Sequence, residues 1–60
     1  MFNKVFYTTK EKELIEEFNY EVGMSLPLSN EFVCINETHY LVAHREFDYS
    51  KKAIIIILTR

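Results

Sequence analysis

The chain has 60 residues, of which 48% are hydrophobic and 27% charged, with one glycine, one proline and a formal net charge of −2. This composition is typical of one folded domain over residues 1–60 and argues against a disordered chain. The single cysteine excludes an internal disulfide and a cysteine-based zinc site, and the negative charge gives no help to non-specific binding of nucleic acid phosphates.

The N-terminal third predicts a strand followed by a helix. Residues 2–7 mix aromatic, β-branched and polar side chains, as strands do. Thr8 precedes Glu11 by three residues, which is the spacing of a helix capping box. We therefore predict a short helix over residues 9–19. Its apolar residues recur at helical spacing: Leu14, Ile15 and Phe18.

A second apolar pattern, with a period of two, runs through residues 18–26. It predicts that the helix ends near Asn19 and that an extended segment follows, with a bulge or bend at Gly23. The only proline then indicates a loop at residues 25–30.

The second half of the chain predicts three antiparallel strands in succession, at residues 32–35, 39–47 and 53–59. The intervening turns, at residues 36–38 and 48–52, have the lengths of hairpin connections. The predicted fold is therefore α+β, with an N-terminal strand, one short helix and a three-stranded β-meander.

The last predicted strand is apolar on both faces, because four isoleucines follow one another at residues 54–57. One short helix can cover only one face of such a sheet. The other face needs either the N-terminal strand, curling over it as in a small barrel, or a second chain. We predict a homodimer that forms through the sheet, with these interface residues: Ile54, Ile56, Leu58 and Val42.

The side chains that most often carry chemistry do not form a recognisable site. His39 and His44 are five residues apart, so in a regular strand they point to opposite faces and cannot share a metal ion. Cys34 lies between two apolar residues, where a buried thiol is expected. We predict no catalytic residue, no metal and no cofactor, and we expect a protein that is not an enzyme.

Acidic residues are concentrated between residues 11 and 31, where six glutamates accompany one lysine. Such a segment is typical of a solvated face, but it could also dock onto a basic site of another protein. The predicted partner-binding residues are Glu13, Glu16, Glu17, Arg45, Asp48 and Tyr49.

Direct binding of nucleic acid is the alternative function. Four tyrosines are available to stack on exposed bases. No basic stripe accompanies them, so we regard nucleic acid as the less favoured partner.

The N-terminus lacks the pattern of a signal peptide, and the longest apolar run, residues 53–58, is far shorter than a membrane helix. We therefore expect a cytoplasmic protein with no membrane partner.

Residues 39–58, "HYLVAHREFDYSKKAIIIIL", resemble segments of small accessory proteins from phages and prophages of low-GC Gram-positive bacteria. In those proteins a similar strand and turn precede an apolar last strand. The matching residues here are Tyr40, Val42, Arg45, Phe47, Asp48 and Tyr49. The resemblance implies a non-enzymatic inhibitor that binds a host protein, either a defence or a housekeeping factor, in the host cytoplasm.

Overall fold

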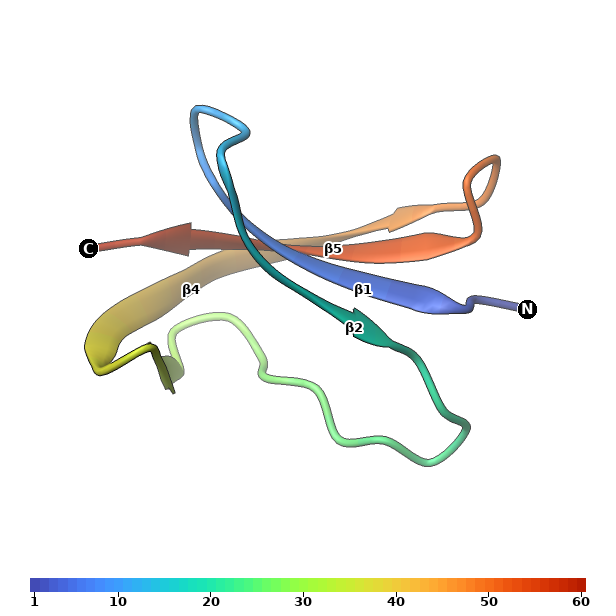
Figure 1. Cartoon of the computed structure of the whole chain (residues 1–60), viewed down its shortest axis with the longest axis horizontal. Coiled ribbons are helices and arrows are strands. Elements are labelled where there is room, and N and C mark those ends of the chain that lie inside the picture. The colour runs from blue at the N-terminus through green and yellow to red at the C-terminus, as the bar shows by residue number, and fades with distance from the viewer.

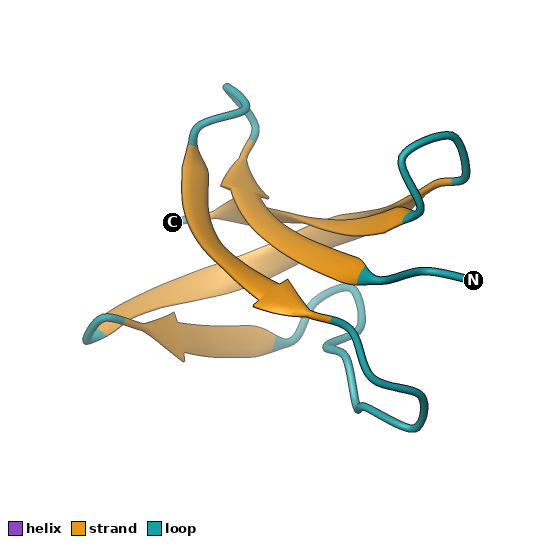
Figure 2. Cartoon of the chain, turned by 45° about the vertical axis from the view of Figure 1, so that its right-hand side comes forward, coloured by secondary structure: helices purple, strands orange, loops and turns teal.

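The protein is built entirely from β-strands (Figure 2). A computed structural model describes all 60 residues. Five strands form one mixed sheet in the order β2-β1-β5-β4-β3, in which β1 and β5 are parallel and every other neighbouring pair is antiparallel. The strands are β1 (Lys4–Thr9), β2 (Leu14–Asn19), β3 (Phe32–Ile35), β4 (Thr38–Asp48) and β5 (Ala53–Thr59).

The sheet twists and curls into a nearly closed barrel. β2 and β3 are its two edges and do not pair with each other. Residues 20–31 connect these two edges and run below the barrel in Figure 1. The curl lets one face of the sheet become an interior without any helix to cover it.

The interior is built around β5, the central strand. Its parallel register with β1 sets Val5 beside Ile54 and Tyr7 beside Ile56. Seven buried residues form the core: Val5, Tyr7, Tyr40, Val42, Ile54, Ile56 and Leu58. Side chains from residues 20–31, β2 and β3 pack against this cluster, so the barrel supplies its own cover on this face.

The predicted α+β fold is wrong, because residues 14–19 form strand β2 instead of a helix. A threonine does accept backbone hydrogen bonds at this point, but the bonds close the β1–β2 hairpin instead of capping a helix. Thr9 Oγ1 accepts a hydrogen bond from Glu13 N at 3.1 Å, and Thr9 O accepts one from Lys12 N at 2.9 Å. An isolated helix of about eleven residues is marginal in water, so pairing with β1 prevails over local helix propensity.

The helical spacing of the apolar residues has a different explanation. The register of β1 and β2 shifts between Tyr7 and Thr8, which leaves Ile15 as an extra residue in β2. Ile15 packs against the core, and Phe18 meets the Tyr7 ring edge-on with the ring centroids 5.7 Å apart. Because of the bulge, Ile15 and Phe18 both point towards the inner face of the sheet. Their separation of three residues is also the spacing of neighbours on one face of a helix.

Residues 20–31 form a connection without regular strand structure, in place of the predicted extended segment. Gly23 has φ of 90° and lies in a turn that Met24 N closes by donating to Glu21 O at 2.9 Å. Tyr20 and Leu26 anchor the connection on the core. Val22 and Met24, the apolar residues between these two anchors, are 81% and 36% exposed, so the period of two does not mark a buried face.

The three C-terminal strands lie where the sequence predicts them, as the antiparallel part of the larger sheet. Asn36 and Glu37 both have positive φ, at 51° and 67°, as a two-residue type I′ hairpin turn requires. In β4 the register shifts between Val42 and His44. Residues after this bulge change faces relative to a regular strand, so His44 pairs with the outward-facing Ile57.

Neighbouring isoleucines of β5 should differ in their contribution to stability. Ile56 is fully buried and Ile55 is partly exposed. We expect Ile56→Ala to lower the free energy of unfolding by about 2–5 kcal/mol, as large-to-small core substitutions do. Ile55→Ala, the matched control, should cost about half as much or less. Urea unfolding at low micromolar concentration measures both, and equal losses would contradict the assignment of the two faces.

The β4–β5 turn should make stability depend on acidic pH. Hydrogen bonds from Ser50 Oγ at 2.7 Å and from Lys51 N at 3.1 Å hold the pKa of the Asp48 carboxyl below its usual range. Because the folded pKa is depressed, this stabilisation is present above the ordinary pKa of about 4 and is lost as pH falls through the folded value.

Asp48→Asn should therefore be less stable than the wild type at pH 7, and the difference should shrink as the pH falls below the ordinary carboxyl pKa of about 4. Chemical unfolding across this range measures the difference. A gap that stays constant with pH would show that the carboxylate does not stabilise the turn.

Candidate functional site

The residues predicted to form a dimer interface lie inside the single chain. Ile54, Ile56, Leu58 and Val42 are at most 2% exposed and belong to the core cluster. They present no surface to a second chain. The alternation of faces along β5 agrees with the prediction. The face with Ile54, Ile56 and Leu58, which was predicted to contact a second chain, is the face that the barrel encloses.

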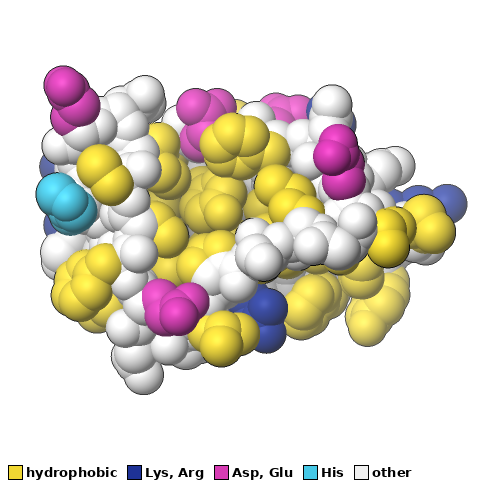
Figure 3. All heavy atoms as spheres, turned by 90° about the horizontal axis from the view of Figure 1, so that it is seen from below, with side chains coloured by type: hydrophobic (Ala, Val, Ile, Leu, Met, Phe, Trp, Pro, Cys, Tyr) yellow, Lys and Arg dark blue, Asp and Glu magenta, His cyan; other side chains and the backbone are white.

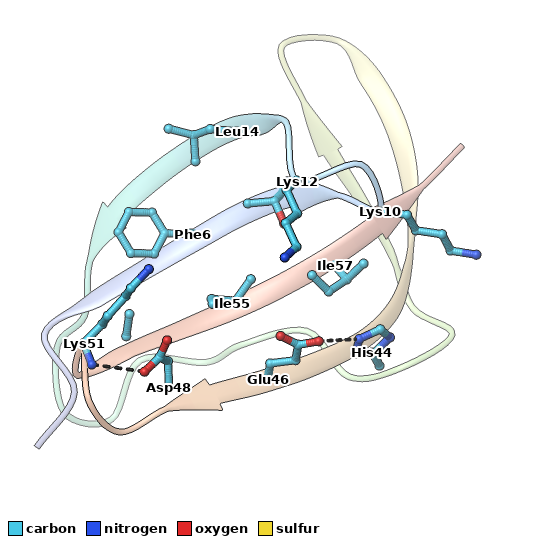
Figure 4. Close-up of a pocket in the computed structure, with 12 residues that line it drawn as sticks. Phe6, Lys10, Lys12, Leu14, His44, Glu46, Asp48, Lys51, Ile55 and Ile57 are labelled. Atoms are coloured by element: carbon cyan, nitrogen blue, oxygen red, sulfur yellow. Dashed lines mark hydrogen bonds and ion pairs between the residues drawn. The ribbon is translucent and has the colours of Figure 1, made fainter.

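The opposite face of the sheet carries an apolar surface, which we call the outer strip (Figure 4). It is formed by Phe6, Leu14, Ala53, Ile55 and Ile57. The strip lies in an open hollow of about 660 Å³ that crosses β2, β1, β5 and β4. Leu14, at the rim, is 54% exposed. Phe6 and Ile55 are partly exposed, whereas Ala53 and Ile57 are 1% and 8% exposed, so the accessible apolar surface of the strip comes from Phe6, Leu14 and Ile55.

Charged side chains of opposite sign border the outer strip on its two sides (Figure 4). The turn between β1 and β2 supplies Lys10 and Lys12. β4, on the other side of β5, supplies Glu46 and Asp48. His44 Nε2 lies 3.0 Å from Glu46 Oε2, which holds that carboxylate along the β4 edge. Lys51, in the β4–β5 turn, also lines the hollow beside Asp48. The strip therefore has a basic side at Lys10 and Lys12 and a mixed side on which Glu46 lies farther from Lys51 than Asp48 does (Figure 4).

A second apolar surface, which we call the aromatic end, lies where the chain enters β1 and leaves β4. The Phe2 ring centroid is 5.6 Å from that of Phe47 and 5.3 Å from that of Tyr49. The Arg45 guanidinium carbon lies 5.6 Å from the Phe47 ring centroid, within the range of a cation–π contact. Phe47 is 45% exposed and Tyr49 is 79% exposed, so the cluster is open to a partner.

Two of the predicted partner-binding residues, Arg45 and Tyr49, come together at the aromatic end through their contacts with Phe47 and Phe2. Asp48 does not join them. It lines the hollow of the outer strip, and its carboxylate accepts hydrogen bonds from the β4–β5 turn.

The predicted acidic residues of the N-terminal half do not form one surface. Glu16 pairs across the hairpin with Tyr7 on the inner face, and Glu17 pairs with Phe6 on the outer face. Glu17 also forms an ion pair with Lys4 at 3.1 Å. Glu13 lies at the β1–β2 turn. A strand separates residues that a helix would have grouped, so the predicted acidic face is divided.

The arrangement of the histidines and the cysteine also differs from prediction. The bulge in β4 places His44 on the outer face, and Cys34 pairs directly with His39 in the β3–β4 hairpin. Cys34 is exposed rather than buried. No group of three histidine, cysteine or carboxylate side chains is arranged to hold a metal ion.

A further apolar area is visible on the underside of the barrel, where the connection between β2 and β3 runs (Figure 3). Hydrophobic side chains line a hollow between polar rims in this view. This is the side on which the two sheet edges remain unpaired, so closure of the barrel is incomplete there.

Phe6, Ile55 and Phe47 were not among the predicted site residues. Phe6 and Ile55 are neighbours in the parallel register of β1 and β5, a pairing that no local pattern indicates. Phe47 was part of the quoted motif, but the bulge in β4 decides its face. Its position beside Arg45 and Tyr49 in the sequence was the available signal.

Comparisons with known proteins give no match: neither a protein-family model, nor a curated protein, nor a solved structure is similar to this chain. The chain has no helix that is long and apolar enough to cross a membrane.

The exposure of Cys34 has a direct chemical consequence. We expect the folded protein to react with one equivalent of a thiol reagent such as DTNB per chain, at a rate within about tenfold of the urea-unfolded chain, because access controls the reaction. Absorbance of the released thiolate measures both rates. Protection of more than about a hundredfold in the folded state would contradict an exposed thiol.

Proposed function

We propose that this chain is a non-enzymatic protein-binding module that acts by steric binding, as a homodimer. The observation that carries the proposal is the aromatic end, a cluster of three aromatic rings and one arginine in which Phe47 and Tyr49 are exposed. Soluble domains rarely expose such clusters unless a partner covers them.

The residue types of the aromatic end favour a protein partner. Tyrosine and arginine are enriched among the residues that dominate the binding energy of interfaces. Tyr49 offers a large surface with few rotatable bonds, and the contact of Arg45 with Phe47 holds the guanidinium near the cluster before binding. A preorganised arginine and tyrosine lose less conformational entropy when a partner docks.

The class of target comes from the resemblance of residues 39–58 to small phage and prophage proteins. On that basis the partner is a host protein, either an anti-phage defence factor or a housekeeping factor, and the chain inhibits it by occupying its surface in the host cytoplasm. Arg45, Phe47 and Tyr49 belong both to the resembling segment and to the aromatic end, which supports this assignment.

Binding of single-stranded nucleic acid is the second candidate, because an exposed tyrosine beside an arginine is also suited to base stacking. The carboxylates of Glu46 and Asp48, in the same strand, oppose the approach of a phosphate backbone. A gel-shift titration at low salt separates the two candidates, since strong and steeply salt-dependent binding would favour nucleic acid.

The protein-binding proposal is tested by affinity capture from a bacterial lysate with tagged wild-type chain and with Tyr49→Ala and Arg45→Ala variants. We expect a stoichiometric partner whose affinity falls by about tenfold or more in each variant, as truncation of a central interface residue does.

Phe32→Ala is the matched control, because Phe32 is a similarly exposed ring, at 74%, and pairs with Leu41 at the opposite end of β4. It should leave capture unchanged. Capture that is insensitive to Tyr49 and Arg45, or equally sensitive to Phe32, would show that the aromatic end is not the binding site.

A further inference from the structure

The outer strip, bordered by Lys12 on one side and Glu46 on the other, lies in an open hollow of about 660 Å³ that no residue of the aromatic end lines. We propose that a second copy of this chain covers the outer strip, face to face, with the two copies related by a two-fold axis parallel to β5. This inference rests on the homodimer in the proposed function, and it assigns the interface to the accessible apolar residues Phe6, Leu14 and Ile55 in place of the buried residues.

The apolar surface requires a cover of matching shape and polarity. Ile55 and Ile57 alternate along β5 with the core residues, and Phe6 lies beside Ile55 in register. Phe6 and Ile55, both partly exposed, line the middle of the hollow, and Leu14, which is 54% exposed, lies at its rim. Two such sheets can pack about 10 Å apart with interdigitating side chains, which removes the apolar surface of both copies from water.

The placement of charge selects a second copy as the occupant. A half-turn about an axis parallel to β5 brings the β4 side of one copy over the β1–β2 side of the other, at the same height along the strand. Glu46 pairs with Ile55 in register, and the Lys12 side chain points from its turn back towards the strip (Figure 4). Each Glu46 then faces the partner's Lys12, and the symmetry makes this contact twice.

Neither side chain is paired with an oppositely charged lysine, arginine or carboxylate of its own chain. Lys12 forms no salt bridge within the chain, and the only intramolecular ion pair of Glu46 is with His44. A small apolar ligand would leave the charged side chains on both sides of the hollow unpaired, whereas a self-complementary interface pairs the lysine of each copy with the glutamate of the other.

This arrangement leaves the aromatic end accessible. Phe47 pairs with Ile54 on the inner face, while Glu46 and Asp48, its neighbours in β4, line the outer hollow. The second copy and the target therefore bind to opposite faces of β4, and one dimer presents two target sites.

Charge reversal tests the interface without altering the core. Glu46→Lys places two lysine pairs across the two-fold axis, and Lys12→Glu places two glutamate pairs there. We expect each variant to raise the dimer dissociation constant by about tenfold or more in sedimentation experiments at low salt. An equimolar mixture of the two variants should dimerise again, because both contacts become oppositely charged.

The matched controls are Glu21→Lys and Lys52→Glu, which make the same changes of charge at exposed residues that do not line the hollow. They should leave the dissociation constant within about threefold of wild type. Circular dichroism and urea midpoints confirm that each variant is folded.

Three results would overturn the inference: wild type that sediments as a 7.2 kDa monomer up to millimolar concentration, variants that dimerise like wild type, or a mixture that fails to recover. Capture of the host target through Tyr49 is a separate readout. A dimer without capture contradicts the proposed target binding and retains this interface. Capture by a monomer retains target binding and contradicts both the homodimer and this interface.

Discussion

The parallel pairing of β1 with β5 is the interaction on which the rest of the structure depends. The chain folds locally into two units, the β1–β2 hairpin and the β3–β4–β5 meander, and only this pairing joins them. It also sets Val5 and Tyr7 against the isoleucines of β5, which creates the core. Without it, each unit would be a two- or three-stranded sheet with one unprotected apolar face.

The sequence could predict the meander because its strands pair with their neighbours along the chain and its turns carry local signals. The N-terminal half could not be predicted in the same way. The local pattern there agrees with a helix, both in the capping spacing of Thr8 and Glu11 and in the apolar spacing of Leu14 and Phe18. The segment nevertheless forms a strand, because of the bulge in β2 and the non-local pairing of β1 with β5. Secondary structure that depends on a pairing between strands 49 residues apart, as Lys4 and Ala53 are, leaves little trace in a short window.

The same distinction explains the candidate sites. Alternation along β5 separates Ile55 and Ile57 from Ile54 and Ile56, but nothing in the strand says which set the barrel encloses. That choice is made by the register with β1 and by the cover that residues 20–31 provide. Arg45 and Tyr49 could be singled out because they are close in sequence, whereas Phe2 joins them only through the fold.

The central position of β5 also determines when the protein can fold during its synthesis. A ribosome releases the strands in chain order, and β5 is the last of the five although it pairs with the first. The β1–β2 hairpin must wait until residues 53–59 have emerged before it can bury its apolar side chains. Until then the nascent chain exposes two incomplete sheets, a state in which a chaperone or a second nascent chain can bind them.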